Sequence, residues 1–227
     1  MLKPILLLLG LLPLLLPGAV PAQPSAAPGI NRAYDNADVR QWRGVFEREG
    51  REVWERRREI VAALELRPGM LVADVGAGTG FFALMFAQAV GPKGRVYAVD
   101  ITPNFVDAIR SRAKALGYHN VIGVVNNARS VLLPAQSVDL VFSSDTYHHF
   151  EYPGPNLASI HAALKPGGEL VVVDYKRIPG VSDPWVLGHV RAGEEVVRQE
   201  ITAAGFELVE SRDDLMRGQF FLRFRKP

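Results

Sequence analysis

A glycine-rich turn directly after an apolar stretch is the strongest chemical signal in the sequence. Residues 72–80 read Val-Ala-Asp-Val-Gly-Ala-Gly-Thr-Gly, and a helical pattern of apolar residues follows. Glycine lets the backbone adopt positive φ and come close to a ligand. Because open α/β sheets bind ligands at the carboxyl ends of their strands, this turn predicts a site for a nucleotide-type cofactor. The candidate binding residues here are Asp74, Gly76, Ala77, Gly78 and Gly80.

The spacing of these glycines bears on which nucleotide binds. A dinucleotide fingerprint has the pattern G-x-G-x-x-G, whereas here the third glycine comes one residue early, at Gly80, and Phe81 follows it. The carboxylate of Asp74 also suits a cationic ligand better than a pyrophosphate. Both features argue against a protein that performs NAD-dependent reduction.

The form of residues 74–80 resembles motif I of the class I S-adenosylmethionine (SAM)-dependent methyltransferases. Residues 96–101, Val-Tyr-Ala-Val-Asp-Ile, resemble the second strand of that family. The resemblance implies SAM as cofactor, with Asp100 accepting hydrogen bonds from both ribose hydroxyls and Ile101 packing on the adenine. A carboxylate has the acceptor capacity for that role.

Later segments extend the resemblance. Asn127 and Ala128 stand where the family usually has an Asp before a small residue, which implies that they read the adenine amino group. Residues 133–142 resemble the approach to the fourth strand, and residues 165–168 resemble the turn before the fifth. Together the similar segments cover residues 72–174.

The candidate reaction residues lie in the segment 143–150, Ser-Ser-Asp-Thr-Tyr-His-His-Phe. In the family the corresponding loop lies along the methionine half of SAM and faces the acceptor. Methyl transfer needs positioning and, for hydroxyl or acidic carbon acceptors, a base. Asp145, His148 and His149 are therefore the predicted catalytic residues. Because adjacent side chains rarely point the same way, we expect one histidine at the site and the other in a structural role.

A metal site at this loop is the less favoured interpretation, although some methyltransferases that act on catechols use magnesium. Hard cations prefer clusters of oxygen ligands, and the sequence has no dense set of carboxylates near this loop. We therefore expect no metal. Residues 174–177 should face the same cleft, and His189, Arg191 and Glu195 either roof the acceptor pocket or form an exposed cap.

The elements that position these residues alternate between strand and helix patterns. Apolar strands separated by helices indicate parallel βαβ units with helices on both faces of the sheet. We expect an α/β fold: a Rossmann-like, mostly parallel sheet of seven strands that ends in an antiparallel hairpin. The predicted strands are 71–75, 95–99, 121–125, 138–143, 169–174, 206–209 and 219–224, and the main helices are 81–90, 105–116, 156–164 and 194–204.

The chain before the sheet divides into three parts. Residues 1–22 combine Lys3, an apolar run and a small-residue ending, which is the order of a secretory signal peptide. Residues 23–39 are expected to be a flexible linker, and residues 40–227 a methyltransferase domain whose first helices form a cap. We expect export to the periplasm or medium, and the alternative is an uncleaved leader that anchors the domain beside a membrane.

Composition excludes several classes of function. The chain has 26 Lys and Arg against 24 Asp and Glu, a balance that gives no support to nucleic-acid binding. It has no cysteine, so thiolate chemistry, including that of arsenite methyltransferases, is excluded. The leading hypothesis is a methyltransferase that acts on a small-molecule acceptor and resembles the ubiquinone and menaquinone biosynthesis group. The alternative is a non-catalytic SAM-binding or scaffold protein. The sequence leaves the oligomeric state open.

Overall fold

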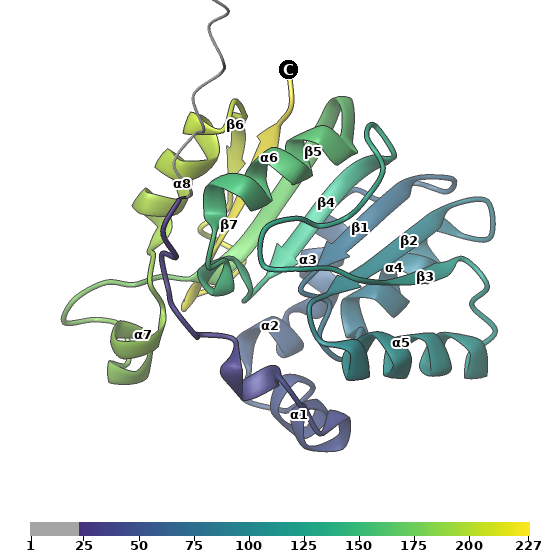
Figure 1. The fold of residues 1–227 in the computed structure, drawn as a ribbon, viewed down its shortest axis with the longest axis horizontal. Coiled ribbons are helices and arrows are strands. Elements are labelled where there is room, and N and C mark those ends of the chain that lie inside the picture. The colour runs from purple at the N-terminus through teal and green to yellow at the C-terminus, as the bar shows by residue number, and fades with distance from the viewer. Residues whose placement is uncertain (1–22) are drawn as a thin grey trace, which may run out of the picture.

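The computed structural model describes residues 23–227, which form one mixed sheet with helices on both faces (Figure 1). The predicted signal peptide lies outside the described residues. The seven strands are arranged in the order β3-β2-β1-β4-β5-β7-β6. Their bounds are β1 Leu71–Val75, β2 Arg95–Asp100, β3 Val121–Val125, β4 Val138–Ser144, β5 Leu164–Tyr175, β6 Glu207–Ser211 and β7 Gln219–Arg225.

One strand, β7, runs opposite to the other six strands of the sheet. β1 to β5 pair with one another in parallel, whereas β7 pairs antiparallel with both β5 and β6. The chain order reverses at β1, which lies between β2 and β4. Such a switch point leaves a crevice at the carboxyl ends of the strands, where ligands bind in open α/β sheets. The predicted Rossmann-like sheet with its antiparallel hairpin is confirmed.

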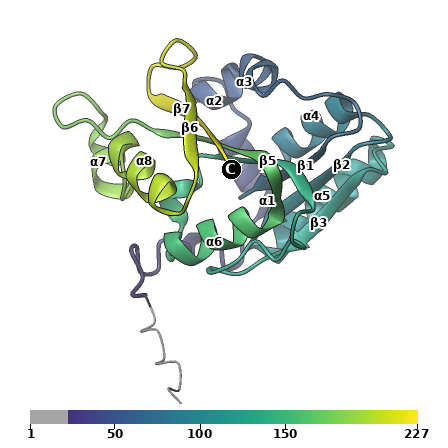
Figure 2. The same cartoon turned by 90° about the horizontal axis from the view of Figure 1, so that it is seen from above.

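The helices cover both faces of the sheet and its carboxyl end. Figure 2 shows α3 and α4 on one side of the sheet and α6 with α8 on the other. Figure 1 shows α1 and α2 below the lower end of the sheet, with α7 apart from them at the lower left. Their bounds are α1 Val39–Phe46, α2 Glu52–Glu55, α3 Arg57–Ala63, α4 Phe81–Val90, α5 Pro103–Ala115, α6 Pro153–Ala163, α7 Pro184–His189 and α8 Glu194–Ala203.

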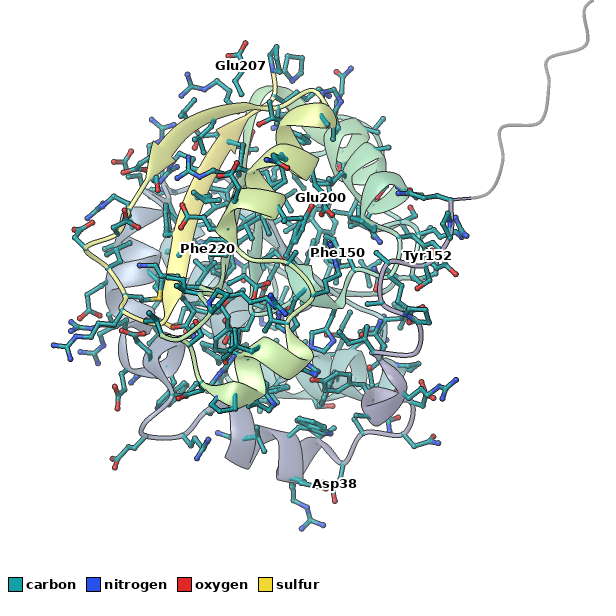
Figure 3. The ribbon with its side chains drawn as sticks, turned by 90° about the vertical axis from the view of Figure 1, so that its left-hand side faces the viewer. Asp38, Phe150, Tyr152, Glu200, Glu207 and Phe220 are labelled. Carbon is teal, nitrogen blue, oxygen red and sulfur yellow. The ribbon has the colours of Figure 1, made fainter. Side chains whose placement is uncertain are left out.

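Two hydrophobic cores sandwich the sheet because successive side chains of a strand point to opposite faces. On β5, Leu170 and Val172 belong to the core beneath α6 and α8, whereas Val171 and Val173 belong to the core beneath α3 and α4. Figure 3 shows Phe150 and Phe220 inside the packed interior, while Asp38 projects from the outside of the cap. A strand buried on both faces explains the continuous apolar runs in the sequence.

The segment 23–39, which its composition predicts to be a flexible linker, forms hydrogen bonds with distant parts of the chain. The backbone N–H of Ala26 donates to the carbonyl of Glu151 over 2.7 Å, and Asn31 donates to the carbonyl of His149 over 3.2 Å. A single 3-10 turn, η1 (Arg32–Tyr34), follows and leads into α1. The segment is held by partners more than a hundred residues away, which local composition does not reveal.

Within residues 23–227, no helix combines the length and the apolar character that crossing a bilayer requires.

Candidate active site

The glycine turn after β1 forms one wall of a pocket. Two of its positions require glycine, because a side chain there would collide with a neighbouring residue. Gly76 has a φ of 75°, and a Cβ built on it would lie 2.1 Å from the side chain of Thr146. Gly80 has a φ of 80°, and its Cβ would lie 2.5 Å from Ile109 on α5. Glycine is therefore required for both the left-handed backbone and the close packing.

Asp100 ends β2 beside the glycine turn and lines the same pocket, which we call the cofactor pocket. Its carboxylate accepts hydrogen bonds from the backbone N–H groups of Gly78 and Thr102, each over 2.8 Å. These bonds fix the carboxylate, and each oxygen retains acceptor capacity for a ligand hydroxyl. Burial raises the pKa of Asp100 from its ordinary value, although the backbone bonds oppose the shift.

Asp74 has a buried carboxylate oxygen, Oδ2, without a hydrogen-bond partner. Its side chain lines the cofactor pocket and is only 3% exposed. Burial, with a smaller contribution from Asp100, raises the pKa of Asp74 to about 7. An unpaired carboxylate beside a pocket provides a partner for a positively charged group of a ligand.

The predicted adenine end of the pocket contains one residue that sequence reasoning missed. Asn127, the predicted residue, is exposed, and its Oδ1 accepts from the backbone N–H of Arg129 over 2.9 Å. Its neighbour Asn126 also lines the pocket and carries a buried Oδ1 without a partner. Ile101 and Ala128 line the same end of the pocket. The sequence signal for Asn126 was its place in the same Asn-Asn-Ala segment.

Aromatic side chains from residues 32–63, which comprise η1, α1, α2 and α3 and which we call the cap, line the cofactor pocket. Tyr34 lies with its ring centroid 6.3 Å from that of Phe105, and Phe46 lies 6.2 Å from the same ring. Glu47, next to Phe46, accepts from Thr79 in the glycine turn over 2.8 Å. These contacts attach the cap to the cofactor site, and sequence patterns did not identify them.

Asp145 is the first residue after β4 and pairs with the cap. Its φ of 46° lies in the left-handed region, a strained conformation that Asp tolerates better than most residues. Its Oδ2 lies 2.7 Å from a guanidinium nitrogen of Arg51, and its Oδ1 is buried without a partner. Burial raises the pKa of Asp145, although Arg51 opposes the shift. The ion pair holds α2 and the loop after β4 together.

His148 is buried against Asp174 at the end of β5. Its Nδ1 lies 2.7 Å from Oδ1 of Asp174, and its backbone N–H donates to Oδ2 over 3.0 Å. Burial lowers the pKa of His148, but Asp174 more than offsets that effect, so the pKa is raised overall. The paired Asp174 orients the ring and leaves Nε2 for another partner.

Both adjacent histidines line a common pocket, and the expected division into one site histidine and one structural histidine stays a prediction. They lie on η2 (Tyr147–His149), a 3-10 turn, and their ring centroids are 4.2 Å apart. His189, at the end of α7, lies 5.3 Å from His148 and 5.2 Å from His149 by ring centroid. Burial and the neighbouring histidines lower the pKa of His149 to about 3.

The tight turn accounts for this arrangement of the two histidine rings. Tyr147 donates its hydroxyl to Glu200 of α8 over 2.7 Å, which anchors the start of η2. Figure 3 shows Glu200 pointing from α8 into the interior near Phe150. With Tyr147 turned toward α8, both imidazoles that follow face the α7 side.

A second pocket, which we call the acceptor pocket, adjoins the cofactor pocket beneath α7. His148 and His189 line it, together with Trp185 of α7. Both pockets share five lining residues, namely Tyr34, Phe46, Arg51, Asp145 and His149. A ligand in one pocket would therefore meet a ligand in the other.

The predicted site residues are brought to these two pockets. Asp145 and His149 lie at the junction, and His148 lies in the acceptor pocket only. Their catalytic roles stay predictions. The binding roles stay predictions as well. The predicted binding residues that line the cofactor pocket are Asp74, Gly76, Ala77, Gly78, Asp100, Ile101, Asn127 and Ala128, whereas Gly80 is the N-cap of α4.

Comparisons with known proteins agree with this geometry. Residues 72–168 match the model of a methyltransferase domain. A protein-L-isoaspartate O-methyltransferase of Ignicoccus hospitalis is 40% identical over 82 residues, which are 36% of this chain and 39% of that protein. A ubiquinone/menaquinone biosynthesis C-methyltransferase of Hydrogenovibrio crunogenus is 32% identical over 123 residues, 54% of this chain and 48% of that protein. The chain thus spans less than half the length of these curated relatives.

Solved structures share the fold. A SAM-dependent methyltransferase from Aquifex aeolicus has a TM-score of 0.73 and 23% identity, covering 84% of this chain and 100% of that chain. A "possible exported protein" from Bordetella parapertussis has a TM-score of 0.66 and 21% identity, covering 86% of this chain and 81% of that chain.

The fold and the cofactor pocket define a Rossmann-like domain that binds a nucleotide-type cofactor. The matches narrow this class: residues 72–168 match a methyltransferase domain, and the fold is shared with SAM-dependent methyltransferases, whose cofactor is SAM. The residues present fit SAM, because a fixed carboxylate, an unpaired carboxylate oxygen and an unpaired amide oxygen line one pocket.

Proposed function

We propose that this protein transfers the methyl group of SAM to a small-molecule acceptor with an apolar body. The observation that carries the proposal is the acceptor pocket, which meets the cofactor pocket along five shared residues. A methyl donor and an acceptor must lie in contact for an in-line displacement, so adjoining pockets suit a transferase. When bound, SAM supplies an electrophilic methyl group on a sulfonium.

The rim of the acceptor pocket supports an apolar acceptor. Val45, Ile178, Val181 and Trp185 line it and expose large apolar surfaces, with Val181 77% exposed. Tyr34 and Phe46 add aromatic surface at the junction of the two pockets. Apolar clefts with a few convergent polar groups are typical of small-molecule sites. One relative, from Geobacillus stearothermophilus, is named a demethylmenaquinone methyltransferase, and a menaquinone precursor is an apolar acceptor.

The chain's own residues would act on the acceptor in three ways. The aromatic cap excludes water from the junction, the Arg51–Asp145 ion pair closes one side, and His149 presents a buried nitrogen there. Single alanine changes at His148 or His149 are expected to lower turnover more than SAM affinity, since these residues face the acceptor.

An acceptor screen tests the proposed activity. The protein is incubated with SAM and a panel of quinols, phenols and catechols with alkyl chains, and S-adenosylhomocysteine (SAH) formation and the mass of each acceptor are measured. We expect SAH release together with one added methyl group on an apolar acceptor. SAH binding without transfer to any member of the panel would favour the alternative, a non-catalytic SAM-binding or scaffold protein.

We also propose that the domain is exported. The order of residue types in the segment 1–22 supports this, and one structural relative is described as a "possible exported protein". Expression of the full chain with a C-terminal tag in a Gram-negative host, followed by intact mass, tests it. Cleavage near Ala22 is expected, whereas a membrane-bound product that retains Met1 would indicate an anchor.

A further inference from the structure

Three imidazoles gather in the wall of the acceptor pocket. His148 and His149 come from η2, and His189 comes from the end of α7, which is far away in the sequence. Each residue offers one ring nitrogen, and these three nitrogens all lie within 4.8 Å of one another. All three residues line the acceptor pocket.

We infer that His148, His149 and His189 bind one divalent transition-metal ion of the kind that prefers imidazole ligands, such as Zn²⁺. Tetrahedral zinc with bonds of about 2.0–2.1 Å places its ligands roughly 3.3 Å apart, so the rings must close by about 1.5 Å or less. His149 and His189 are only partly buried, which leaves their side chains room for this adjustment.

The surroundings of His148 match those of a metal ligand. Its Nδ1 is held by Asp174 over 2.7 Å, and its backbone N–H is held by the same carboxylate. Histidines that ligate metals commonly give their other ring nitrogen to a carboxylate, which fixes the ring and strengthens the ligand. Asp174 is 1% exposed, so this orientation is firmly imposed.

The second histidine contributes an independent observation. Nδ1 of His149 is buried without a hydrogen-bond partner. A buried polar atom without a partner is costly, and binding an ion would satisfy it if this nitrogen is the ligand atom. The nearby carboxylates of Asp145 and Asp174 add negative potential, which the guanidinium of Arg51 offsets at Asp145.

This site differs in chemistry from the magnesium site that the sequence disfavours. Hard cations select oxygen ligands, whereas imidazole suits zinc, copper, iron and nickel. Three protein ligands leave a fourth position, as in catalytic zinc sites. Because the histidines line the acceptor pocket, that position is available to an oxygen atom of the acceptor.

A role in methyl transfer rests on the proposed function, although the metal site itself does not. An acceptor hydroxyl that binds the ion would release its proton to solvent more readily, because a bound cation lowers the pKa of its oxygen ligand. In the transfer the oxygen forms a bond to the methyl carbon while the sulfur–methyl bond breaks, and that electron pair stays on the sulfur of SAH.

Metal binding is tested directly on the full chain without a histidine tag, which would itself bind metal. Co²⁺ is titrated as a spectroscopic probe and Zn²⁺ by calorimetry, each with the metal alone. We expect one ion per chain and a visible Co²⁺ spectrum. The variant His189→Ala should weaken binding at least 10-fold, and Asp174→Asn should weaken it by about 10–100-fold.

A matched control is His119→Ala, because His119 is exposed and lies outside both pockets. It should bind Co²⁺ like the original protein. The melting temperature without metal shows whether His189→Ala folds normally, and added Zn²⁺ should raise that temperature in the original protein only. Absence of stoichiometric binding, or equal affinity in His189→Ala, would overturn the inference.

SAH binding measured on the same samples separates this inference from the proposed function. Protein that binds SAH but neither Co²⁺ nor Zn²⁺ contradicts the metal site alone. Protein that binds metal through the histidines but shows no affinity for SAH supports the metal site and contradicts the proposed transferase.

Discussion

Asp74 lies at the end of the first strand with one carboxylate oxygen unpaired, so its charge opposes folding and favours a cationic ligand at the same time. Burial raises its pKa to about 7 in the folded protein, above its ordinary value of 3.8. The folded state therefore binds more protons than the unfolded state between these values, and this carboxyl lowers stability as pH rises through that window.

Replacing Asp74 by Asn removes that penalty. The stability of Asp74→Asn relative to the original protein should increase by roughly 2–3 kcal/mol between pH 5 and pH 8, as measured by urea unfolding. Asp107→Asn is the matched control, because Asp107 is an exposed carboxylate on α5. A difference that is the same at both pH values would show that Asp74 is not held in the protonated form.

Asn126 and Asn127 offer a test of which amide faces the cofactor. Asn126 has the buried unpaired oxygen, whereas the oxygen of Asn127 is already bonded to the backbone of Arg129. We expect Asn126→Ala to weaken SAH binding by about 0.5–1.5 kcal/mol in calorimetry, which is the usual contribution of one hydrogen bond. A larger loss in Asn127→Ala would support the assignment made from the family resemblance instead.

Site residues could be predicted from the sequence where they belong to a contiguous motif. Asp74 and Asp100 follow from patterns that lie next to apolar strands, and the structure brings both to one pocket. Tyr34 and His189 reach the pockets from separate parts of the chain, and Asp174 reaches His148 from the end of β5. Tyr34 and the partnership between Asp174 and His148 carry no local signal, because they depend on long-range packing.

At the scale of elements, the cap and the loop after β4 are joined by one partly buried ion pair. The side chains of Arg51 and Asp145 are 15% and 6% exposed. Removing one partner from such a pair leaves a charge uncompensated, which typically costs about 3–5 kcal/mol. The pair therefore determines how firmly the cap closes the pockets.

Arg51→Met should lower the free energy of unfolding by up to about 3–5 kcal/mol and weaken SAH binding, because both pockets lose part of their common wall. Denaturant unfolding and calorimetry measure the two effects. Arg56→Met is the control, since the exposed pair of Arg56 and Glu59 should contribute less than about 1 kcal/mol. If Arg51→Met behaves like this control, the cap does not depend on the ion pair.

The elements of the sheet were predictable and those of the cap were not. The predicted bounds of β1, β3 and α4 agree with the structure, because apolar runs between turn residues mark buried strands and helices. The first helices of the domain were predicted without bounds, and the structure has three short ones there, α1, α2 and α3. The short helix α7 was not predicted, since its six residues are too few to show a helical period.

At the scale of the molecule, the order of strands follows from general rules of chain connection. Parallel strands joined by helices give right-handed crossovers, and a reversal of order at β1 leaves one crevice for ligands. Two late strand patterns joined by a polar segment, 206–209 and 219–224, predicted the antiparallel hairpin. The position of the cap over that crevice depends on long-range contacts such as the hydrogen bond from Thr79 to Glu47. The rules that govern how strands are connected do not predict such contacts.

The central claim is that residues 72–128 form a binding site for SAM, and calorimetry with SAH tests it most directly. The original protein should bind SAH, and Asp100→Ala should weaken binding by about 1.5–3 kcal/mol, the range for hydrogen bonds to a charged group. Asp107→Ala, on the exposed face of α5, should bind like the original protein. No binding at millimolar SAH, or equal affinity in Asp100→Ala, would contradict the claim.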